Sequence, residues 1–297
     1  MKLLHYRLQP GSRDYMAYND GERRPAAMDA QRDFAQLEQE MASWWYPARR
    51  NLLREVAEQV LRDKREARIL DMGGAAEFDL GQPSPFRIVN QHSTLTASAF
   101  HQWHGGRNLV CSSPEELAFP SNTFDLVLAG DFLQSIEDDR AALREIRRVL
   151  KDGALLCLTV PAYAFLWNEQ DERRGHCRRY RVSELRRKLT TSGFEVQRAS
   201  YFVATAFVPL ALGGMIKNIV RTSSTGDGNG TRRGRAANAA MSALLEMERH
   251  LLHHINFPFG TVVVCWARKP PLVTERVTVP AWERHWVPSP RLTWSGS

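Results

Sequence analysis

Residues 124–161 read FDLVLAGDFLQSIEDDRAALREIRRVLKDGALLCLTVP and decide the fold class. Residues 124–129 are apolar except for Asp125, and such a run is typical of a strand that is buried on both faces of a sheet. Residues 137–150 predict a helix, because three acidic side chains lie at its start, where the helix dipole favours negative charge. A second apolar run at residues 154–160 predicts another strand, and Pro161 closes it. A helix between two buried strands indicates a parallel sheet.

The same alternation of strands and helices extends in both directions along the chain. It predicts an α/β fold with a mostly parallel seven-strand sheet and helices on both faces. In such sheets, ligands bind at the carboxyl ends of the strands. The other strands are expected at residues 68–71, 86–89, 108–111, 195–202 and 260–267, and the other helices at residues 28–43, 47–60, 183–192 and 236–255.

The strand pattern predicts one large domain between two segments of different composition. Residues 1–27 form a polar leader that we expect to be irregular, and residues 28–269 form the α/β domain. Within this domain, residues 203–255 are an insertion between the last two strands, with an apolar segment, a basic linker and a helix. Residues 270–297 are a tail that is rich in proline and carries three of the eight tryptophans. The tail is a candidate segment for binding a protein partner.

Composition excludes several classes of protein. Four cysteines without C-x-x-C spacing argue against a disulfide scaffold and a structural zinc site, and we expect no metal. The net charge of +7 is compatible with an anionic substrate or surface. A basic stripe with interleaved aromatic residues would indicate nucleic-acid binding, and the sequence has none. The first residues lack the apolar run of a secretory signal, so we expect the protein in the cytoplasm.

Residues 199–216 form an uncharged, largely apolar stretch that reaches the lower length limit of a membrane-spanning helix. Pro209, Gly213 and Gly214 interrupt it, and its beginning has the pattern of a strand. We therefore expect a buried strand followed by a buried or lid-like helix. The alternative is an apolar surface that touches lipid without crossing it, which would make the protein membrane-associated.

Five segments carry a resemblance to a known family. They are WWYPARRNLL (44–53), ARILDMGG (67–74), FDLVLAGD (124–131), LREIRRVLKDGALLCLTVP (143–161) and FPFGTVVVCWARKP (257–270). They resemble class I S-adenosylmethionine-dependent methyltransferases of the small-molecule type, which have a Rossmann-like sheet. The resemblance implies S-adenosyl-L-methionine as the cofactor. It also implies an acceptor that is a small molecule, a lipid or a lipid-linked sugar.

The resemblance assigns the first cofactor motif to the loop after the first predicted strand of the domain. Asp71, Gly73 and Gly74 match this motif, whose glycines let the backbone approach the ligand. Ala75 and Glu77 stand where the family has its next two glycines. A side chain at these positions narrows the space for the cofactor, so this part of the motif is degenerate.

Further cofactor positions follow the next strands. The acid that binds the ribose is replaced by Asn90, or by its neighbour Gln91, and the acid that binds the adenine is replaced by Ser113. Asp131 is retained at the end of its strand, and Trp45 belongs to a helix expected to cover the cleft. Neutral groups in place of acids weaken the hydrogen bonds to the cofactor.

A loop after residues 154–160 matches the family pattern W-x-x-x-D-x-x-x-x-H-x-R-R-Y and is expected to bind the acceptor. His176 is a candidate base, because a neutral imidazole accepts a proton near neutral pH, and Tyr180 is the second candidate catalytic residue. The alternative is that this polar cluster only ties the loop to the following helix. The expected substrate-binding residues are Trp167, Asp171, Arg178 and Arg179, of which the arginines suit a phosphate or carboxylate.

The sequence supports two functions of different classes. One is a methyltransferase, in which methyl transfer to an acceptor depends mainly on positioning. The other is a catalytically inactive pseudo-methyltransferase that serves as a scaffold or regulatory subunit. Glu77, Asn90 and Ser113 favour the second hypothesis, whereas the match in the acceptor loop favours the first.

Overall fold

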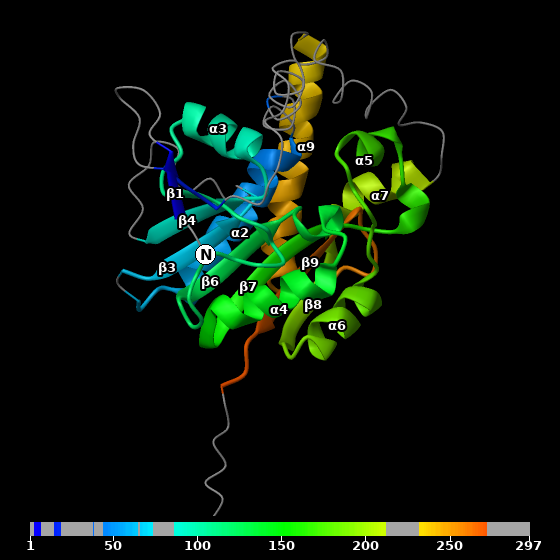
Figure 1. Cartoon of the computed structure of the whole chain (residues 1–297). Helices are drawn as coiled ribbons and strands as arrows, with labels where there is room; N and C mark the ends of the chain where they lie inside the picture. Colours follow the sequence, from blue (N-terminus) through cyan, green and yellow to red (C-terminus); the bar gives the residue numbers. More distant parts are fainter. Residues whose placement is uncertain are drawn as a thin grey trace, which may run out of the picture.

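One mixed sheet forms the centre of the molecule (Figure 1). Its strands are β1 (Leu3–Tyr6), β2 (Tyr15–Tyr18), β3 (Arg68–Met72), β4 (Arg87–His92), β5 (Leu109–Cys111), β6 (Phe124–Gly130), β7 (Leu150–Pro161), β8 (Glu195–Phe202) and β9 (Val262–Arg268). Their order across the sheet is β1-β2-β5-β4-β3-β6-β7-β9-β8. Strands β2 to β7 run parallel, whereas β1 and β9 run antiparallel to their neighbours. This computed structural model describes residues 3–6, 15–18, 38, 44–64, 66–73, 86–211 and 232–271.

Helices pack on both faces of the sheet. They are α2 (Trp45–Val60), α3 (Leu95–Trp103), α4 (Asp139–Val149), α5 (Glu169–Arg173), α6 (Val182–Thr191), α7 (Ala204–Ala211) and α9 (Arg232–Leu252), with single turns η1 (Leu133–Ser135) and η2 (Ala164–Leu166). Buried side chains of α4 and α6 belong to one apolar layer. Those of α2 and α9 belong to the layer on the opposite face. The sheet is therefore the middle layer of three (Figure 1).

Strand β6 separates the two apolar layers. All seven of its residues are buried. Leu126 and Leu128 pack in the layer of α2 and α9, whereas Val127 and Ala129 pack in the layer of α4 and α6. This alternation follows from the two-residue period of a strand. It confirms that the apolar run in the sequence is a strand buried on both faces.

The seven strands from β3 to β9 confirm the predicted Rossmann-like α/β fold. The expectation of an irregular leader is wrong where β1 and β2 form, because they extend the sheet beside β5. Helix α3 was not predicted from the sequence, since its threonine, serine and histidine are weak helix formers. Thr94 caps this helix by accepting from the backbone of Ala97 at 3.2 Å. The helix expected at residues 28–43 lies outside the described residues apart from position 38, and so does the tail from residue 272.

The predicted insertion begins with α7 and ends with α9. Strand β8 ends at Phe202 and α7 begins at Ala204, which confirms a strand followed by a helix in the apolar stretch. Glu248 of α9 is 3% exposed and accepts from the backbone nitrogens of Ala204 and Thr205 at 2.9 and 2.7 Å. This carboxylate caps α7 and fixes it to α9. Among the described helices, none is both long and apolar enough to cross a membrane.

Candidate functional site

The loops at the carboxyl ends of the parallel strands form the candidate site. Three non-glycine residues there have a left-handed backbone: Asp131 after β6 with φ 50°, Tyr163 after β7 with φ 56°, and Val203 after β8 with φ 60°. Such conformations cost about 1–3 kcal/mol each and persist only where the surroundings fix them. Glu66, Asn108 and Asn122 have the same conformation before β3, β5 and β6, so the side chains at the carboxyl edge, and not the backbone angles, mark this edge as a place for function.

The end of β3 has the backbone that the first cofactor motif requires. Asp71 is fully buried, and Gly73 has a φ of 82°, which favours glycine. The backbone amide of Gly73 donates to the carbonyl of Gln91 at 2.9 Å, so β3 and β4 end side by side. The remaining positions of the motif lie outside the described residues, and their roles stay predictions: Gly74, Ala75 and Glu77.

Two amide side chains near the end of β4 each have a carbonyl oxygen that accepts no hydrogen bond from the described residues. Asn90 donates through Nδ2 to the carbonyl of Arg107 at 2.8 Å, and Gln91 donates through Nε2 to the carbonyl of Ser112 at 2.7 Å. Both side chains are fully buried, yet Asn90 Oδ1 and Gln91 Oε1 have no hydrogen-bond partner in the described part of the chain. An unsatisfied buried acceptor costs about 1–3 kcal/mol. Successive residues of a strand point to opposite faces of the sheet, so one of the two acceptors, and not the pair, fits a ligand that donates a hydroxyl group, as the ribose of a nucleoside does.

The end of β5 carries a carboxylate that sequence reasoning missed. The hydroxyl of Ser113 donates to Glu115 Oε2 at 2.5 Å and accepts from the Glu115 backbone nitrogen at 3.3 Å. Ser113, the residue predicted to contact adenine, is thus engaged with its neighbour. Glu115 provides an acid at this strand end, two positions later than the family pattern has it. A comparison position by position does not detect such a shift.

Asp131 joins the end of β6 to helix α2. Its carboxylate accepts from Trp45 Nε1, from Arg49 Nη1 at 2.9 Å and from the hydroxyl of Thr159 at 3.1 Å. Trp45 also lies against Phe202, with ring centroids 6.0 Å apart. The structure thus brings together the two predicted cofactor residues of this region, Trp45 and Asp131. It adds Arg49, which sequence reasoning did not single out.

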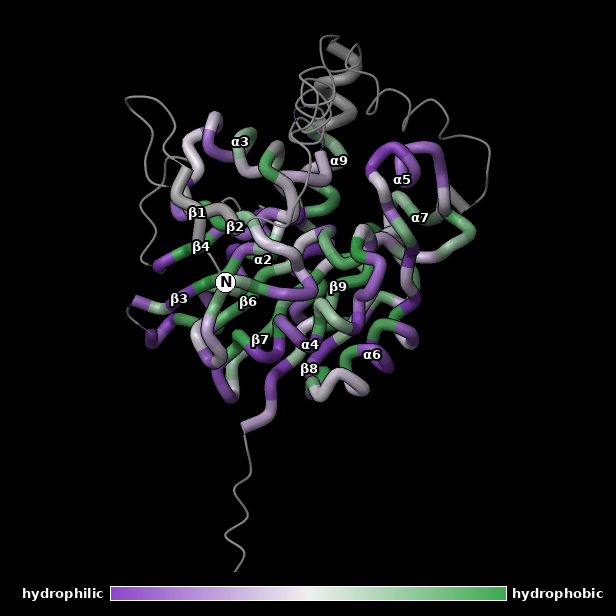
Figure 2. Tube along the Cα trace, viewed as in Figure 1, coloured by the Kyte–Doolittle hydropathy of each residue, from purple (hydrophilic) through white to green (hydrophobic). Residues whose placement is uncertain are grey.

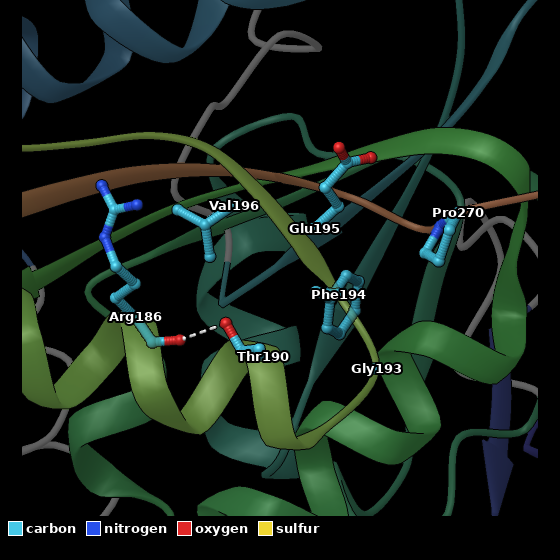
Figure 3. Close-up of a pocket in the computed structure, with 7 residues that line it drawn as sticks. All are labelled: Arg186, Thr190, Gly193, Phe194, Glu195, Val196 and Pro270. Atoms are coloured by element: carbon cyan, nitrogen blue, oxygen red, sulfur yellow. Dashed lines mark hydrogen bonds between the residues drawn. The ribbon is translucent and has the colours of Figure 1, made fainter.

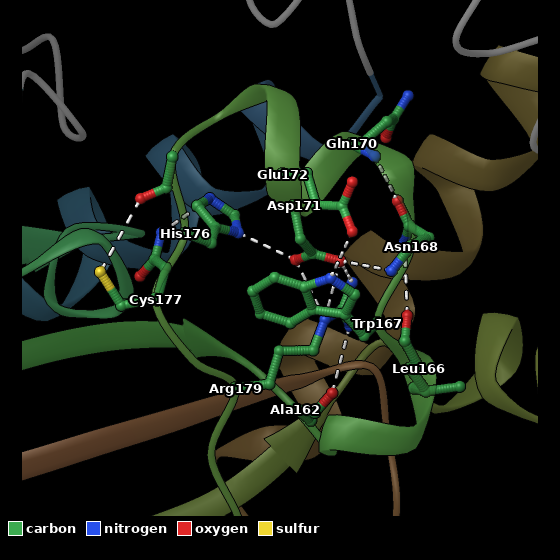
Figure 4. Close-up of polar contacts among 12 residues, drawn as sticks. Ala162, Leu166, Trp167, Asn168, Gln170, Asp171, Glu172, His176, Cys177 and Arg179 are labelled. Atoms are coloured by element: carbon green, nitrogen blue, oxygen red, sulfur yellow. Dashed lines mark hydrogen bonds and ion pairs between the residues drawn. The ribbon is translucent and has the colours of Figure 1, made fainter.

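Asp171 is the centre of the acceptor loop (Figure 4). Its side chain, 2% exposed, accepts from Nδ1 of His176 at 2.9 Å and from the guanidinium of Arg179, whose Nη2 lies 2.7 Å away. The backbone nitrogen of Asn168 donates to it at 2.8 Å, which completes a capping box at the start of α5. Burial alone would raise the pKa of Asp171, but the hydrogen bonds from His176 and Arg179 outweigh it and hold the pKa well below its usual range.

The other nitrogen of His176 faces the end of β6. Asp171 accepts from Nδ1, and this hydrogen bond assigns the lone pair to Nε2 in the neutral ring. Nε2 lies 3.5 Å from Nε2 of Gln134 in η1, and the buried Gln134 Oε1 has no described partner. An oriented imidazole with its lone pair on Nε2 can accept a proton. Predicted residues His176 and Asp171 therefore form a pair suited to acid–base chemistry.

The structure places Tyr180 in the core, where its hydroxyl is engaged with another side chain. Its side chain is fully buried, and its hydroxyl donates to Asp139 Oδ2 at 2.9 Å. Arg178 also pairs with Asp139 at 2.9 Å and donates to the carbonyl of Glu137 at 2.8 Å. Burial and the neighbouring Asp139 raise the pKa of Tyr180. Tyr180 and Arg178 thus tie the loop to α4, which precedes it, whereas the structural alternative expected a tie to the helix that follows.

Two other predicted substrate-binding residues differ in exposure. Arg179 is nearly buried, because it donates to Asp171 and to the carbonyl of Ala162 at 3.2 Å. Trp167 is 37% exposed, and its indole nitrogen lies 3.4 Å from Glu172 Oε1 (Figure 4). Arg179 positions Asp171, whereas Trp167 is open to an acceptor.

An aromatic cluster that sequence reasoning missed borders the acceptor loop. The rings of Tyr163 and Tyr201 stack at 4.8 Å with an interplanar angle of 12°. Phe207 of α7 lies 5.4 Å from Tyr163, and Phe165 and Phe259 lie 6.4 and 5.3 Å from Phe207. We call these five residues the aromatic platform. They come from three distant segments, so no local pattern in the sequence indicates them.

A cavity of about 450 Å³ lies away from these groups, at the opposite edge of the sheet (Figure 3). It is formed where β8 begins and the chain leaves β9. Its lining residues are Arg186, Thr190, Gly193, Phe194, Glu195, Val196 and Pro270. In the part of the chain that the structure describes, no cluster of three or more His, Cys, Asp or Glu side chains could hold a metal ion. The candidate chemistry is therefore at the carboxyl ends of the strands.

Comparison with known proteins places the fold and these groups in a family. Residues 44–199, more than half of the chain, match the family model described as a methyltransferase domain. The chain belongs to this family. It is a class I S-adenosylmethionine-dependent methyltransferase, as the sequence resemblance implied. The family implies S-adenosylmethionine as the methyl donor.

Two curated relatives are methyltransferases from Oryza sativa subsp. japonica. The chain is 28% identical over 109 residues to the chloroplastic 2-methyl-6-phytyl-1,4-hydroquinone methyltransferase 1. This match covers 34% of the chain and 32% of that enzyme. The chloroplastic 2-methyl-6-phytyl-1,4-hydroquinone methyltransferase 2 is 27% identical over 112 residues, with 35% and 32% covered. The chain thus matches about a third of the length of these relatives.

Solved structures that are similar to the chain include a cyclase and a methyltransferase. The cyclase SpnF is 21% identical in sequence, with a TM-score of 0.48. The alignment covers 75% of this chain and 81% of the SpnF chain. Phosphoethanolamine N-methyltransferase 2 of Haemonchus contortus is 16% identical, with a TM-score of 0.48. The alignment covers 74% of this chain and 52% of that enzyme. The family assignment rests on the match to the domain.

Proposed function

We propose that the protein transfers a methyl group from S-adenosylmethionine to a hydroxyl group of an apolar small-molecule or lipid acceptor. The observation that carries the proposal is the pair formed by His176 and Asp171, which leaves the lone pair of His176 Nε2 directed away from Asp171. The sulfonium of the donor supplies an activated methyl group, so the protein has to position the acceptor and receive its proton. His176 Nε2 receives that proton, while Asp171 stabilises the resulting imidazolium.

The ends of β3, β4 and β5 are the proposed donor side of the site. Gly73 allows close approach to the backbone, and one of the free acceptors of Asn90 and Gln91 suits a ribose hydroxyl. Glu115 offers a carboxylate to the adenine amino group. Asp131, which is engaged with Trp45 and Arg49, closes the other side by holding α2 against β6. These neutral and shifted contacts replace the acidic ones of the family pattern.

The ends of β7, β8 and β9 are the proposed acceptor side. The aromatic platform and the indole of Trp167 provide apolar surface beside the His176–Asp171 pair. The names of the rice relatives describe methylation of a hydroquinone that carries a phytyl chain. A phenolic hydroxyl on an apolar molecule would suit both the imidazole and the aromatic rings. We therefore favour this acceptor over a phosphorylated one, because Arg178 and Arg179 are paired with Asp139 and Asp171.

The alternative is an inactive scaffold or regulatory subunit. It is supported by the replacement of the ribose acid by Asn90 and by the internal pairing of Asp131. A protein partner would then bind through the tail, whose residues from 272 onward lie outside the described part. We place either form of the protein in the cytoplasm or at a membrane surface.

Binding and turnover separate the two functions. Isothermal calorimetry with S-adenosylmethionine and its demethylated product should give micromolar binding to the full chain if the donor side is functional. Transfer of a labelled methyl group to a hydroquinone with an apolar tail in detergent micelles then tests the chemistry. His176→Gln should lower kcat about 100-fold, whereas the exposed His254→Gln should leave it unchanged.

A folded protein that binds neither donor nor product would refute the proposal and support the scaffold hypothesis. Donor binding without turnover of any hydroxyl acceptor would contradict the acceptor assignment. An unchanged kcat in His176→Gln would contradict the role of the imidazole.

A further inference from the structure

We propose that the aromatic platform docks the protein on the surface of a bilayer that contains anionic lipid. The proposal deepens the proposed function, since it names the surface from which a lipid acceptor would be taken. It rests on the exposure of the platform, on its cohesion and on the charge around it. It concerns contact with one leaflet of the bilayer.

The platform exposes aromatic rings to a degree that is unusual for a folded surface. Phe165 is 63% exposed and Phe259 is 38% exposed, and the adjacent Trp167 is 37% exposed. Single exposed apolar residues are common, but several aromatic rings in mutual contact indicate an interaction surface. Tyrosine and tryptophan are enriched at the interface between lipid and water, where an apolar ring and a polar atom are both accommodated.

The platform is a continuous surface and not a set of loose side chains. Phe165 comes from η2, Phe207 from α7 and Phe259 from the segment before β9, and their rings contact one another at 5.3–6.4 Å. Helix α7 is held in place by the Glu248 carboxylate at its first two backbone nitrogens. A surface ordered before binding pays little conformational entropy when it docks.

The charge of the neighbouring segment is complementary to an anionic surface. Residues 162–182 contain five arginines and three acidic residues, and the whole chain has a net charge of +7. Arg178 and Arg179 are paired with Asp139 and Asp171, so the attraction to an anionic surface is assigned to the exposed Arg181. Arg181 is exposed and acts electrostatically on Tyr163 of the platform. Each basic residue near an anionic membrane contributes about 1 kcal/mol of attraction. Apolar rings with a net positive rim favour a bilayer with anionic lipid over an uncharged one.

The distribution of hydropathy agrees with contact at an interface. Helix α7 is hydrophobic and lies beside the hydrophilic α5 (Figure 2). The apolar side of this boundary would enter the headgroup region, while the charged side would stay in water. The platform also adjoins the acceptor loop, so docking would place the His176–Asp171 pair close to the membrane surface.

The test is sedimentation of the full chain with large vesicles, either of phosphatidylcholine alone or mixed with phosphatidylglycerol. We expect the wild type to bind the mixed vesicles more tightly. The double variant Phe165→Ser, Phe259→Ser should lower the partition coefficient at least about tenfold on both kinds of vesicle. Arg181→Glu should lower it about tenfold on the mixed vesicles only.

Matched variants elsewhere on the surface are the controls. Trp103→Ser removes an indole that is 82% exposed on α3, and Arg140→Glu reverses an exposed charge on α4. Neither should change the partition coefficient, and circular dichroism should show that every variant is folded. Equal binding of the wild type and the double variant, or equal losses in the control variants, would overturn the proposal, and so would failure of the wild type to bind mixed vesicles.

The outcome is independent of the proposed function. Vesicle binding is measured without donor or acceptor, whereas methyl transfer is measured in micelles. A chain that methylates in micelles but ignores vesicles contradicts the docking surface alone. A chain that binds vesicles through the platform but transfers no methyl group contradicts the proposed function alone.

Discussion

The donor side and the acceptor side of the site are built from opposite kinds of polar contact. On the donor side, most of the buried polar groups are neutral, as in the amides of Asn90 and Gln91 and the imidazoles of His92 and His101, and Asp71 is the buried carboxylate among them. On the acceptor side, they are ion pairs centred on buried carboxylates such as Asp171. Neutral groups leave lone pairs open to a ligand, whereas charged pairs satisfy one another. The comparison indicates a preformed acceptor loop and a donor side that a ligand completes.

The largest loss of stability is expected at Gly260, where two backbone segments of the acceptor side lie close together. A Cβ at Gly260 would lie 2.2 Å from the Phe202 carbonyl oxygen and 2.9 Å from its nitrogen. Gly260→Ala should therefore lower the free energy of unfolding by about 3 kcal/mol or more, measured by urea denaturation. Gly153→Ala is the control, because its Cβ would meet no atom within 4 Å and only its φ of 77° is strained. A loss of about 1 kcal/mol is expected there, and similar losses in both variants would contradict the close approach.

The charged network of the acceptor loop gives the next prediction. Asp171→Asn removes the negative charge that pairs with His176 and Arg179. The side chains of these two residues are then left buried without a carboxylate partner. We expect a loss of about 3 kcal/mol in the free energy of unfolding and a lower kcat. Glu169→Gln on the same helix is the control, since Glu169 and Arg173 are 78% and 66% exposed and their pair contributes little. A loss in Asp171→Asn no greater than in the control would show that the loop is not held by its ion pairs.

The acceptor loop also shows how far the sequence predicts a site. The pattern from Trp167 to Tyr180 correctly grouped Asp171 with His176, because the two residues are only five positions apart and α5 turns them toward each other. The same pattern made Tyr180 a candidate for catalysis. Nothing local indicates that its hydroxyl meets Asp139, 41 positions earlier, in the core.

The sheet was easier to predict than its edges. Buried strands such as β6 have apolar runs long enough to be recognised without neighbours, whereas β1 and β2 are four residues each and depend on pairing with β5. Contacts such as that of Arg49 with Asp131, or of Phe207 with Phe259, join segments far apart in the chain. They are set by tertiary packing, so the sequence alone does not reveal them.

Acid should destabilise the two sides over different pH ranges. Burial lowers the pKa of His92 to about 3 and of His101 to about 4, with a smaller contribution from His101 to His92 and from His104 to His101. Between these values and about 6.5, the unfolded chain binds more protons than the folded chain, so stability falls as the pH falls. Burial would raise the pKa of Asp139, but hydrogen bonds from Lys188, Tyr180 and Arg178 lower it. The acceptor side therefore loses stability only below about pH 4, where unfolded carboxylates become protonated.

Unfolding free energies measured from pH 7 to pH 5 test this difference. We expect the wild type to lose about 4 kcal/mol over this range, about 2 kcal/mol from each of the two histidines. His101→Gln should reduce the pH dependence, whereas His254→Gln, at an exposed position, should not. The same slope in His101→Gln and wild type would contradict the assignment of the donor side as the acid-sensitive one.

The smallest effect distinguishes a residue that supports the loop from one that reacts. Tyr180→Phe removes hydrogen bonds from the hydroxyl to Asp139 and, at 3.3 Å, to the carbonyl of Leu133, but keeps the ring in the core. Asp139 retains Lys188 and Arg178, so we expect a loss of about 1 kcal/mol in the free energy of unfolding and an unchanged kcat. His176→Gln should show the reverse, with nearly full stability and little turnover. A fall in kcat for Tyr180→Phe at unchanged stability would return Tyr180 to the catalytic machinery, because a purely structural hydroxyl affects the stability and not the kcat of the folded protein.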